Sequence, residues 1–207
     1  MHTALRATSQ TLSQRIRVQL ESDPSLAPFF NSGLGGTMIV SLNTPKEMIE
    51  RTIAGVSVWL YRVIRDEERL NAPPFRRDFN SLERVPLPVR LHYLITPIIN
   101  TTVAVAGPET EQVILGKIMQ TFHDHPTLRG ADLQDDYIGT EVELNVRLES
   151  LALEEITRVW DALEGSYQLS LSYEVSVVNI ESKIEPEKIA PVLVALPEHG
   201  VIVSSDP

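Results

Sequence analysis

Histidines are the first candidates for chemistry in this sequence. His123 and His125 flank Asp124, and His92 lies in an alternating apolar segment upstream. Histidine and aspartate can ligate Zn²⁺ or Fe²⁺, so the three histidines could serve a small metal-dependent hydrolase. Residues two apart at a helix end rarely converge on one ion, however, and the chain has no H-E-x-x-H pattern. A histidine in the last helical turn also complements the helix dipole. We therefore expect structural histidines and no metal site.

The remaining polar groups predict no catalytic site and no cofactor. The sequence has no G-x-S-x-G, P-loop or G-x-G-x-x-G pattern. The glycines at 33–36 precede a β-prone segment, whereas a phosphate-binding loop normally precedes a helix. Adjacent carboxylates point apart on a helix or strand, and alternate serines line one face of a strand. We therefore expect these groups to be ordinary surface residues: Asp135, Asp136, Glu154, Glu155, Ser170, Ser172 and Ser176.

Composition excludes several further classes. The chain has 207 residues, of which 43% are hydrophobic and 22% charged, enough to build a globular core. Cysteine is absent, which excludes disulfides, thiolate catalysis and cysteine-ligated metals. No apolar run reaches the roughly 18 residues of a bilayer-spanning helix. The N-terminus has no secretory-signal pattern, so we expect synthesis and assembly in the cytoplasm.

The charge is distributed unevenly. The formal net charge is −10, and residues 141–207 carry 4 basic and 13 acidic groups, which contributes −9. This sign argues against a nucleic-acid partner and against an anionic membrane surface. Two interpretations of the acidic region stay open: a solvated face that aids solubility, or a surface that docks on a basic partner.

Hydrophobic periodicity divides the chain into helices and strands. In the first helix, an apolar stripe runs through Leu5, Leu12, Ile16 and Leu20, with Ser9, Gln10, Ser13, Gln14 and Arg17 on the other side. The helices are expected at 2–22, 109–123 and 153–163, and the strands at 37–42, 55–65, 89–96, 141–148 and 167–180.

The strands differ in how they should be buried. Segment 55–65 is apolar on both sides, which predicts a central strand and surfaces that one subunit does not fully use. Pro97 is expected to end the strand at 89–96. In the strand at 167–180, strict alternation predicts these inward residues: Leu169, Leu171, Tyr173, Val175 and Val177.

This order predicts an α+β fold, with a mixed, mostly antiparallel sheet and helices on one face. The proline-rich segment 72–88 is expected to be a long surface connection or arm. We expect one domain over 1–182, followed by an extended tail over 183–207 that adds strands at an edge.

Four segments in this order resemble one protein family. They read PLPVRLHYLITPI (86–98), ILGKIMQTFHDHPTL (114–128), VRLESLALEEITRVWDAL (146–163) and YQLSLSYEVSVVNIES (167–182). The series is similar to the N-terminal domain of the cap, or tail-terminator, proteins of extracellular contractile injection systems, which are phage-tail-like particles. The similarity extends over about residues 5–185.

The resemblance implies a structural protein with a phage tail-terminator-like fold, in agreement with the α+β prediction. It implies a hexameric ring that closes the tube and sheath and contacts the terminal inner-tube ring and the terminal sheath ring. It implies no enzyme activity. Two alternatives stay open at this point: a phage-type head–tail connector, and the metal-dependent hydrolase that would use His92, His123 and His125.

Overall fold

The computed structural model describes residues 2–69, 75–78, 81–83, 85–99, 107–185 and 187–188. The α-helices are α1 (Ala4–Ser22), α2 (Ala27–Phe30), α3 (Pro45–Glu50), α4 (Pro108–Asp124) and α5 (Leu153–Ala162). The strands are β1 (Ile39–Ser41), β2 (Gly55–Arg65), β3 (Phe75–Asp78), β4 (Ser81–Glu83), β5 (Leu87–Ile98), β6 (Thr127–Arg129), β7 (Glu143–Glu149), β8 (Leu171–Ile180) and β9 (Glu187–Lys188). Short 3-10 helices are η1 (Ser32–Leu34), η2 (Glu67–Arg69), η3 (Gly130–Asp132) and η4 (Asp135–Tyr137).

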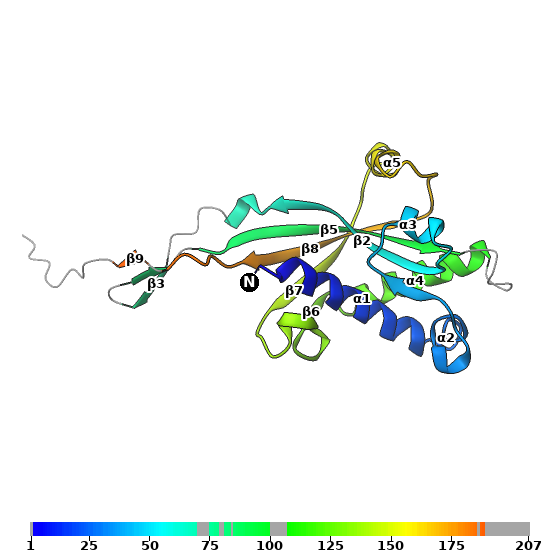
Figure 1. Ribbon diagram of the computed structural model, residues 1–207, viewed down its shortest axis with the longest axis horizontal. Coiled ribbons are helices and arrows are strands. Elements are labelled where there is room, and N and C mark those ends of the chain that lie inside the picture. The colour runs from blue at the N-terminus through cyan, green and yellow to red at the C-terminus, as the bar shows by residue number, and fades with distance from the viewer. Residues whose placement is uncertain are drawn as a thin grey trace, which may run out of the picture.

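A six-stranded sheet forms the centre of the molecule, in the order β1-β2-β5-β8-β7-β6 (Figure 1). Only the β1–β2 pair is parallel, and the other neighbours are antiparallel. The predicted α+β class and mostly antiparallel sheet are therefore confirmed. The strand at 55–65 lies inside the sheet, between β1 and β5, as its two apolar faces predict.

The first face of the sheet is covered by α1 and α4 (Figure 1). The stripe residues Leu12, Ile16 and Leu20 of α1 are at most 1% exposed and pack in the main core. Ile114, Ile118 and Phe122 of α4 are buried in the same core, where the Phe122 ring lies 5.0 Å from that of Tyr173. These two helices confirm the predicted stripes.

The polar side of α1 departs from the prediction. Ser9 and Ser13 were expected on the exposed side, but both are buried. Ser9 donates to the carbonyl of Leu5 and lies 2.9 Å from the Tyr93 hydroxyl of β5, while Ser13 donates to the Gln10 carbonyl. Small hydroxyl side chains can be buried in a helix because they satisfy their hydrogen bonds on the preceding turn.

The second face of the sheet carries α3 and α5. Trp160 of α5 and Leu163, the residue after the helix, form a separate small core with Leu94 of β5, against which Trp59 and Tyr61 also pack. The predicted one-sided arrangement of helices thus applies to α1 and α4, whereas α5 packs on the opposite face. Ser170 and Ser172 were expected to be exposed, but α5 covers this region and both are buried.

Two β-bulges change which residues face the core. In β2, Leu60 is opposite Tyr93 and Arg62 is opposite His92, so Tyr61 is an extra residue. Strict alternation would place Arg62 on the same face as Val56 and Val58. The bulge moves Arg62 to the opposite face.

A second bulge lies in β8, where Val175 pairs with Leu91 and Val178 pairs with Val89. Two residues of β8 consequently lie opposite the single residue Arg90. Val178 is 1% exposed, so the core face of β8 moves to this residue after the bulge. Leu169 was predicted to face inward, yet it precedes the strand and is 46% exposed.

Prolines do not end β5 where the sequence predicts. The strand continues through Pro97, which pairs with Val56, to Ile98. The ladder with β8 ends at Ile95, so Pro97 lies where β5 has a ladder partner on one side only. Pro88 lies at the other end, beyond the last β2 pair at Val89. A strand can tolerate a proline where one side of its backbone needs no ladder partner.

Beyond one end of the main sheet, β3, β4 and β9 form a separate three-stranded sheet, at the left in Figure 1. The proline-rich connection therefore contains a hairpin that was not predicted. Ser81 and Leu82 of β4 pair with Lys188 and Glu187, so the start of the 183–207 tail adds a strand to this sheet. The predicted tail strands at 189–196 and 201–203 lie outside the described residues.

Candidate functional site

A group of polar side chains lies on the second face of the main sheet, beside the contact between Trp160 and Leu94. We call it the second-face cluster, and its members come from β2, the turn after β2, β5, β7 and β8: Tyr61, Asp66, Arg90, His92, Glu149, Ser172 and Glu174. The strand register explains why they meet: His92 is directly opposite Glu174, and Glu149 is directly opposite Ser172.

A chain of hydrogen bonds joins side chains from four strands of this cluster, β2, β5, β7 and β8. His92 Nδ1 lies 2.8 Å from Glu149 Oε1, and the Ser172 hydroxyl donates to Glu149 Oε2 at 2.7 Å. The Tyr61 and Ser172 hydroxyl oxygens are 3.0 Å apart. Burial raises the pKa of Glu149, but the hydrogen bonds from His92 and Ser172 outweigh it and leave that pKa below its ordinary value. Glu149 is therefore ionised at neutral pH.

Ion pairs form the other end of the cluster. Arg90 Nη2 donates to Asp66 Oδ1 at 2.9 Å, and the Asp66 side chain is 2% exposed. Arg90 Nη1 lies 3.9 Å from Glu174 Oε2, a longer contact. A buried carboxylate needs such a partner because an unpaired buried charge is strongly destabilising.

The order of the hydrogen bonds does not match a hydrolytic triad. In a triad the histidine lies between the serine and the carboxylate, so that it can take the serine proton. Here the carboxylate of Glu149 lies between Ser172 and His92. The arrangement holds the three side chains together, and it does not activate the serine.

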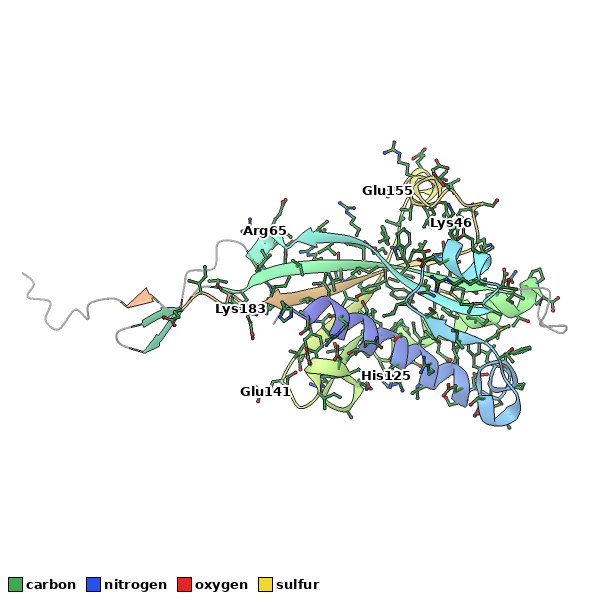
Figure 2. The ribbon with its side chains drawn as sticks, in the orientation of Figure 1. Lys46, Arg65, His125, Glu141, Glu155 and Lys183 are labelled. Atoms are coloured by element: carbon green, nitrogen blue, oxygen red, sulfur yellow. The ribbon has the colours of Figure 1, made fainter. Side chains whose placement is uncertain are left out.

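The histidines proposed for a hydrolase do not converge. His123 and His125 are exposed at the C-terminal end of α4, where the backbone N–H of His125 donates to the Thr121 carbonyl. Because α4 covers the first face and His92 contacts Glu149 on the second, the sheet separates His92 from the other two. Figure 2 places His125 on the opposite side of the sheet from Glu155 of α5. The three histidines therefore cannot bind one metal ion together, as the hydrolase alternative requires.

The other polar candidates have local structural contacts. Arg6 forms ion pairs with Asp135 and Asp136. The Glu155 carboxylate accepts a hydrogen bond from the backbone N–H of Ala152 at the start of α5. In the glycine segment at 33–36, the Asn31 side chain accepts a hydrogen bond from the Gly33 N–H and begins η1, which is not a helix long enough for a phosphate site.

The two acidic neighbours of His92 are distant from it in the sequence. Glu149 and Glu174 are 57 and 82 residues beyond it in the chain. The one sequence feature that could have indicated their proximity is that His92, Glu149 and Glu174 all occupy positions on the same face of amphipathic strands. The register and the order of β5, β8 and β7 were needed to place them together.

A small separate sheet and several apolar side chains are exposed on the described surface. The sheet of β3, β4 and β9 projects beyond the end of β5 and β8 (Figure 1). Large apolar side chains remain exposed on the main body, with Leu34 at 65%, Ile138 at 67% and Leu153 at 72%, and Ile184 in the segment between β8 and β9 is 61% exposed. Within the described residues, no helix combines the length and hydropathy needed to cross a membrane.

A family model for the Pvc16 N-terminal domain matches residues 7–193, most of the chain. The chain belongs to this family. The match spans both the main sheet and β9, so the family domain includes the strands that carry the second-face cluster. No curated protein sequence matches the chain significantly.

Two solved cryo-EM structures share the fold of this Pvc16 N-terminal domain. One is the sheath/tube terminator of the extracellular contractile injection system PVC in its extended state, with a TM-score of 0.61 and 15% identity. The other is the tube-terminating cap of the anti-feeding prophage, with a TM-score of 0.58 and 18% identity. The alignments cover 96% and 90% of this chain. They cover 64% and 59% of the solved chains, so this chain spans less than two-thirds of either.

Proposed function

We propose that this protein is a cap of a contractile injection particle and terminates its tube and sheath. Membership of the Pvc16 N-terminal domain family over residues 7–193 is the observation that carries the proposal. Two structures with this fold are a sheath/tube terminator and a tube-terminating cap, which agrees with it. The protein is assembled in the cytoplasm under this proposal and becomes part of the extracellular particle.

The proposed role is structural, without catalysis. The hydrogen-bond order of Ser172, Glu149 and His92 supports this, because it does not activate a nucleophile. The partners are the terminal inner-tube ring and the terminal sheath ring. The proposal includes no cofactor, no nucleic acid and no membrane partner, in keeping with the net charge of −10.

The proposed assembly is a six-membered ring closed by heterologous contacts, in which one patch of each subunit meets a different patch of the next. The apolar residues Val56, Val58 and Trp59 of 55–65 pack within one subunit, the two valines in the main core under α1 and Trp59 against α5, so they do not supply such a patch. Other features support contacts between subunits: the exposed apolar side chains of the body and the projecting sheet, whose edge strands present backbone groups.

The tail from Lys183 onward is a proposed contact with a neighbouring cap subunit or with the terminal tube or sheath ring. The alternative is that the tail packs on its own subunit, and the pairing of its first strand, β9, with β4 of the same chain supports this for Glu187 and Lys188. Two truncations separate the possibilities. Removing 189–207 keeps β9, whereas removing 183–207 also exposes the edge of β4.

The proposal is tested by particle length and ring mass. In cells that produce the particles, loss of the protein should give tubes and sheaths of uncontrolled length, and the full chain should restore a uniform length. If both truncated proteins restore uniform length and form rings of the same mass, the tail is not the contact. If loss of the whole protein leaves particle length and sheath retention unchanged, the cap function is wrong.

A further inference from the structure

Three side chains that commonly bind metal ions meet on the second face. His92, Glu149 and Glu174 each offer a ligand atom, and these atoms lie within 4.8 Å of one another. They come from three neighbouring strands, β5, β7 and β8, whose hydrogen-bonded ladders fix their backbone positions. Ligands built on strands are held more rigidly than ligands on loops.

One nitrogen of the histidine lacks a partner. The His92 residue is 4% exposed, Nδ1 lies 2.8 Å from Glu149 Oε1, and Nε2 is buried without a hydrogen-bond partner. A buried polar atom left without a partner is destabilising, because it has lost its hydrogen bonds to water. In metal sites the two imidazole nitrogens divide their tasks in this way, since one bonds a carboxylate and the other binds the metal. The unpartnered nitrogen therefore points to a ligand.

The local charges favour an added cation. The side chains of Glu149 and Glu174 are 17% and 13% exposed, so two carboxylates share a poorly solvated space. Arg90 is the nearest cation to Glu174, but it binds Asp66 at 2.9 Å and Glu174 only at 3.9 Å. Arg62 acts on Glu149 from β2 and lowers its pKa only as a minor contribution.

We propose that His92, through Nε2, and Glu174 bind one divalent first-row transition-metal ion, while Glu149 holds the imidazole ring through Nδ1. One imidazole nitrogen with carboxylate oxygens suits Zn²⁺ and its neighbours better than Mg²⁺ or Ca²⁺, which prefer all-oxygen ligand sets. Bonds of about 2.0–2.2 Å place neighbouring ligands roughly 3–3.5 Å apart, so small side-chain rotations bring His92 and Glu174 into range. This site is independent of the proposed cap function and revises the expectation that His92 binds no metal.

The ion would fasten β5 to β8 beside α5, and β7 would be linked to them through the contact of Glu149 with His92. Because the unfolded chain has no preformed site, binding stabilises the folded state by RT ln(1 + [L]/Kd). An ion at a hundred times its Kd would add about 2.7 kcal/mol. The ion has a structural role here, since the cluster has no activated nucleophile.

The test is calorimetric titration of the metal-stripped full chain with ZnCl₂, and with MgCl₂ for comparison. We expect about one equivalent of Zn²⁺ with a rise in melting temperature, and no comparable Mg²⁺ binding. His92→Asn and Glu174→Gln should each weaken Zn²⁺ binding about tenfold or more. The double variant His123→Asn/His125→Asn is the matched control, because those histidines are exposed on the other side of the sheet.

Circular dichroism and the unfolding midpoint show whether each variant folds. The Glu174 side chain is 13% exposed and the His92 side chain 5%, so Glu174→Gln disturbs the packing less and keeps the test decisive if His92→Asn does not fold. The proposal is overturned if the stripped protein binds no Zn²⁺, or if binding is lost in the His123/His125 control and retained in Glu174→Gln. The measurement uses the isolated protein, so its outcome is separate from that of the cap assays.

Discussion

The hydroxyl oxygens of Ser9 and Tyr93 lie 2.9 Å apart, where α1 crosses β5. Ser9 donates its own proton to the Leu5 carbonyl, so the Tyr93 hydroxyl donates to Ser9. Burial raises the pKa of Tyr93, which keeps this group protonated as a donor. The bond joins the first helix to the middle of the sheet inside the main core.

Replacing Tyr93 with Phe tests this link. The ring stays in the core and only the hydrogen bond is lost, so the free energy of unfolding should fall by about 1 kcal/mol. Denaturant unfolding measures the change. Tyr167→Phe is the control, because Tyr167 is 51% exposed, and it should change stability by less than about 0.5 kcal/mol. An equal loss in both variants would contradict a specific role for the Ser9 contact.

Trp160 anchors α5 to the second face. Truncating a buried tryptophan to alanine costs about 3–5 kcal/mol, and Trp160 belongs to a small core that is separate from the main one. We expect Trp160→Ala to speed amide hydrogen exchange in α5 while α1 stays protected. Leu153→Ala, at a position 72% exposed on the same helix, should change little. Equal loss of protection in α1 and α5 would show that the two cores unfold as one unit.

The helix α3 depends on its first turn. Thr44 accepts a hydrogen bond from the Glu47 N–H, and the Glu47 carboxylate accepts one from the Thr44 N–H, which completes a capping box. Thr44→Ala should lower the free energy of unfolding by about 1 kcal/mol in thermal or denaturant unfolding. The exposed Glu50 of the same helix gives a control, Glu50→Ala. If both substitutions have the same effect, the cap is not responsible.

The sequence of this region held a signal that periodicity missed. The run Thr44-Pro45-Lys46-Glu47 has a cap residue, a proline at the first helical position and a glutamate at the third. Hydrophobic periodicity predicts only the strand at 37–42 in this region, and that strand ends before this run begins. The short strand β6 was missed for a different reason, because its three residues carry too little pattern to indicate a period.

The long amphipathic elements were predictable, and the inter-strand contacts were not. The stripe of Leu12, Ile16 and Leu20 indicates α1 from local spacing alone, and Trp160 with Leu163 marks the buried side of α5. A bulge adds one residue without any change in composition, so the face of Arg62 could not be read from alternation. The convergence of His92 and Glu149 depends on the order of β5, β8 and β7, which is a property of the whole sheet.

The depressed pKa of Glu149 predicts a dependence of stability on pH. A carboxyl group whose pKa is lower in the folded state stabilises the fold above its unfolded pKa of about 4.3, and this contribution disappears as the pH falls through the folded value. Wild type should therefore be more stable than Glu149→Gln at pH about 7, and the difference should shrink in acid. Unfolding in EDTA measures this without bound metal.

The control for the pH experiment is Glu154→Gln on the exposed side of α5, which should follow wild type across the range. A difference between wild type and Glu149→Gln that stays constant from neutral pH into acid would contradict the assignment. In that case the glutamate would contribute through packing, and its hydrogen bonds from His92 and Ser172 would have no net electrostatic effect.

The most direct measurement of the central claim is a cryo-EM reconstruction of the ends of intact particles from cells that produce this protein. The cap function predicts a closed ring at one end of the tube and sheath, built from six copies of the fold that α1, α4 and the sheet β1-β2-β5-β8-β7-β6 define. The contradictory result is an end without this fold, or copies of it distributed along the length of the particle.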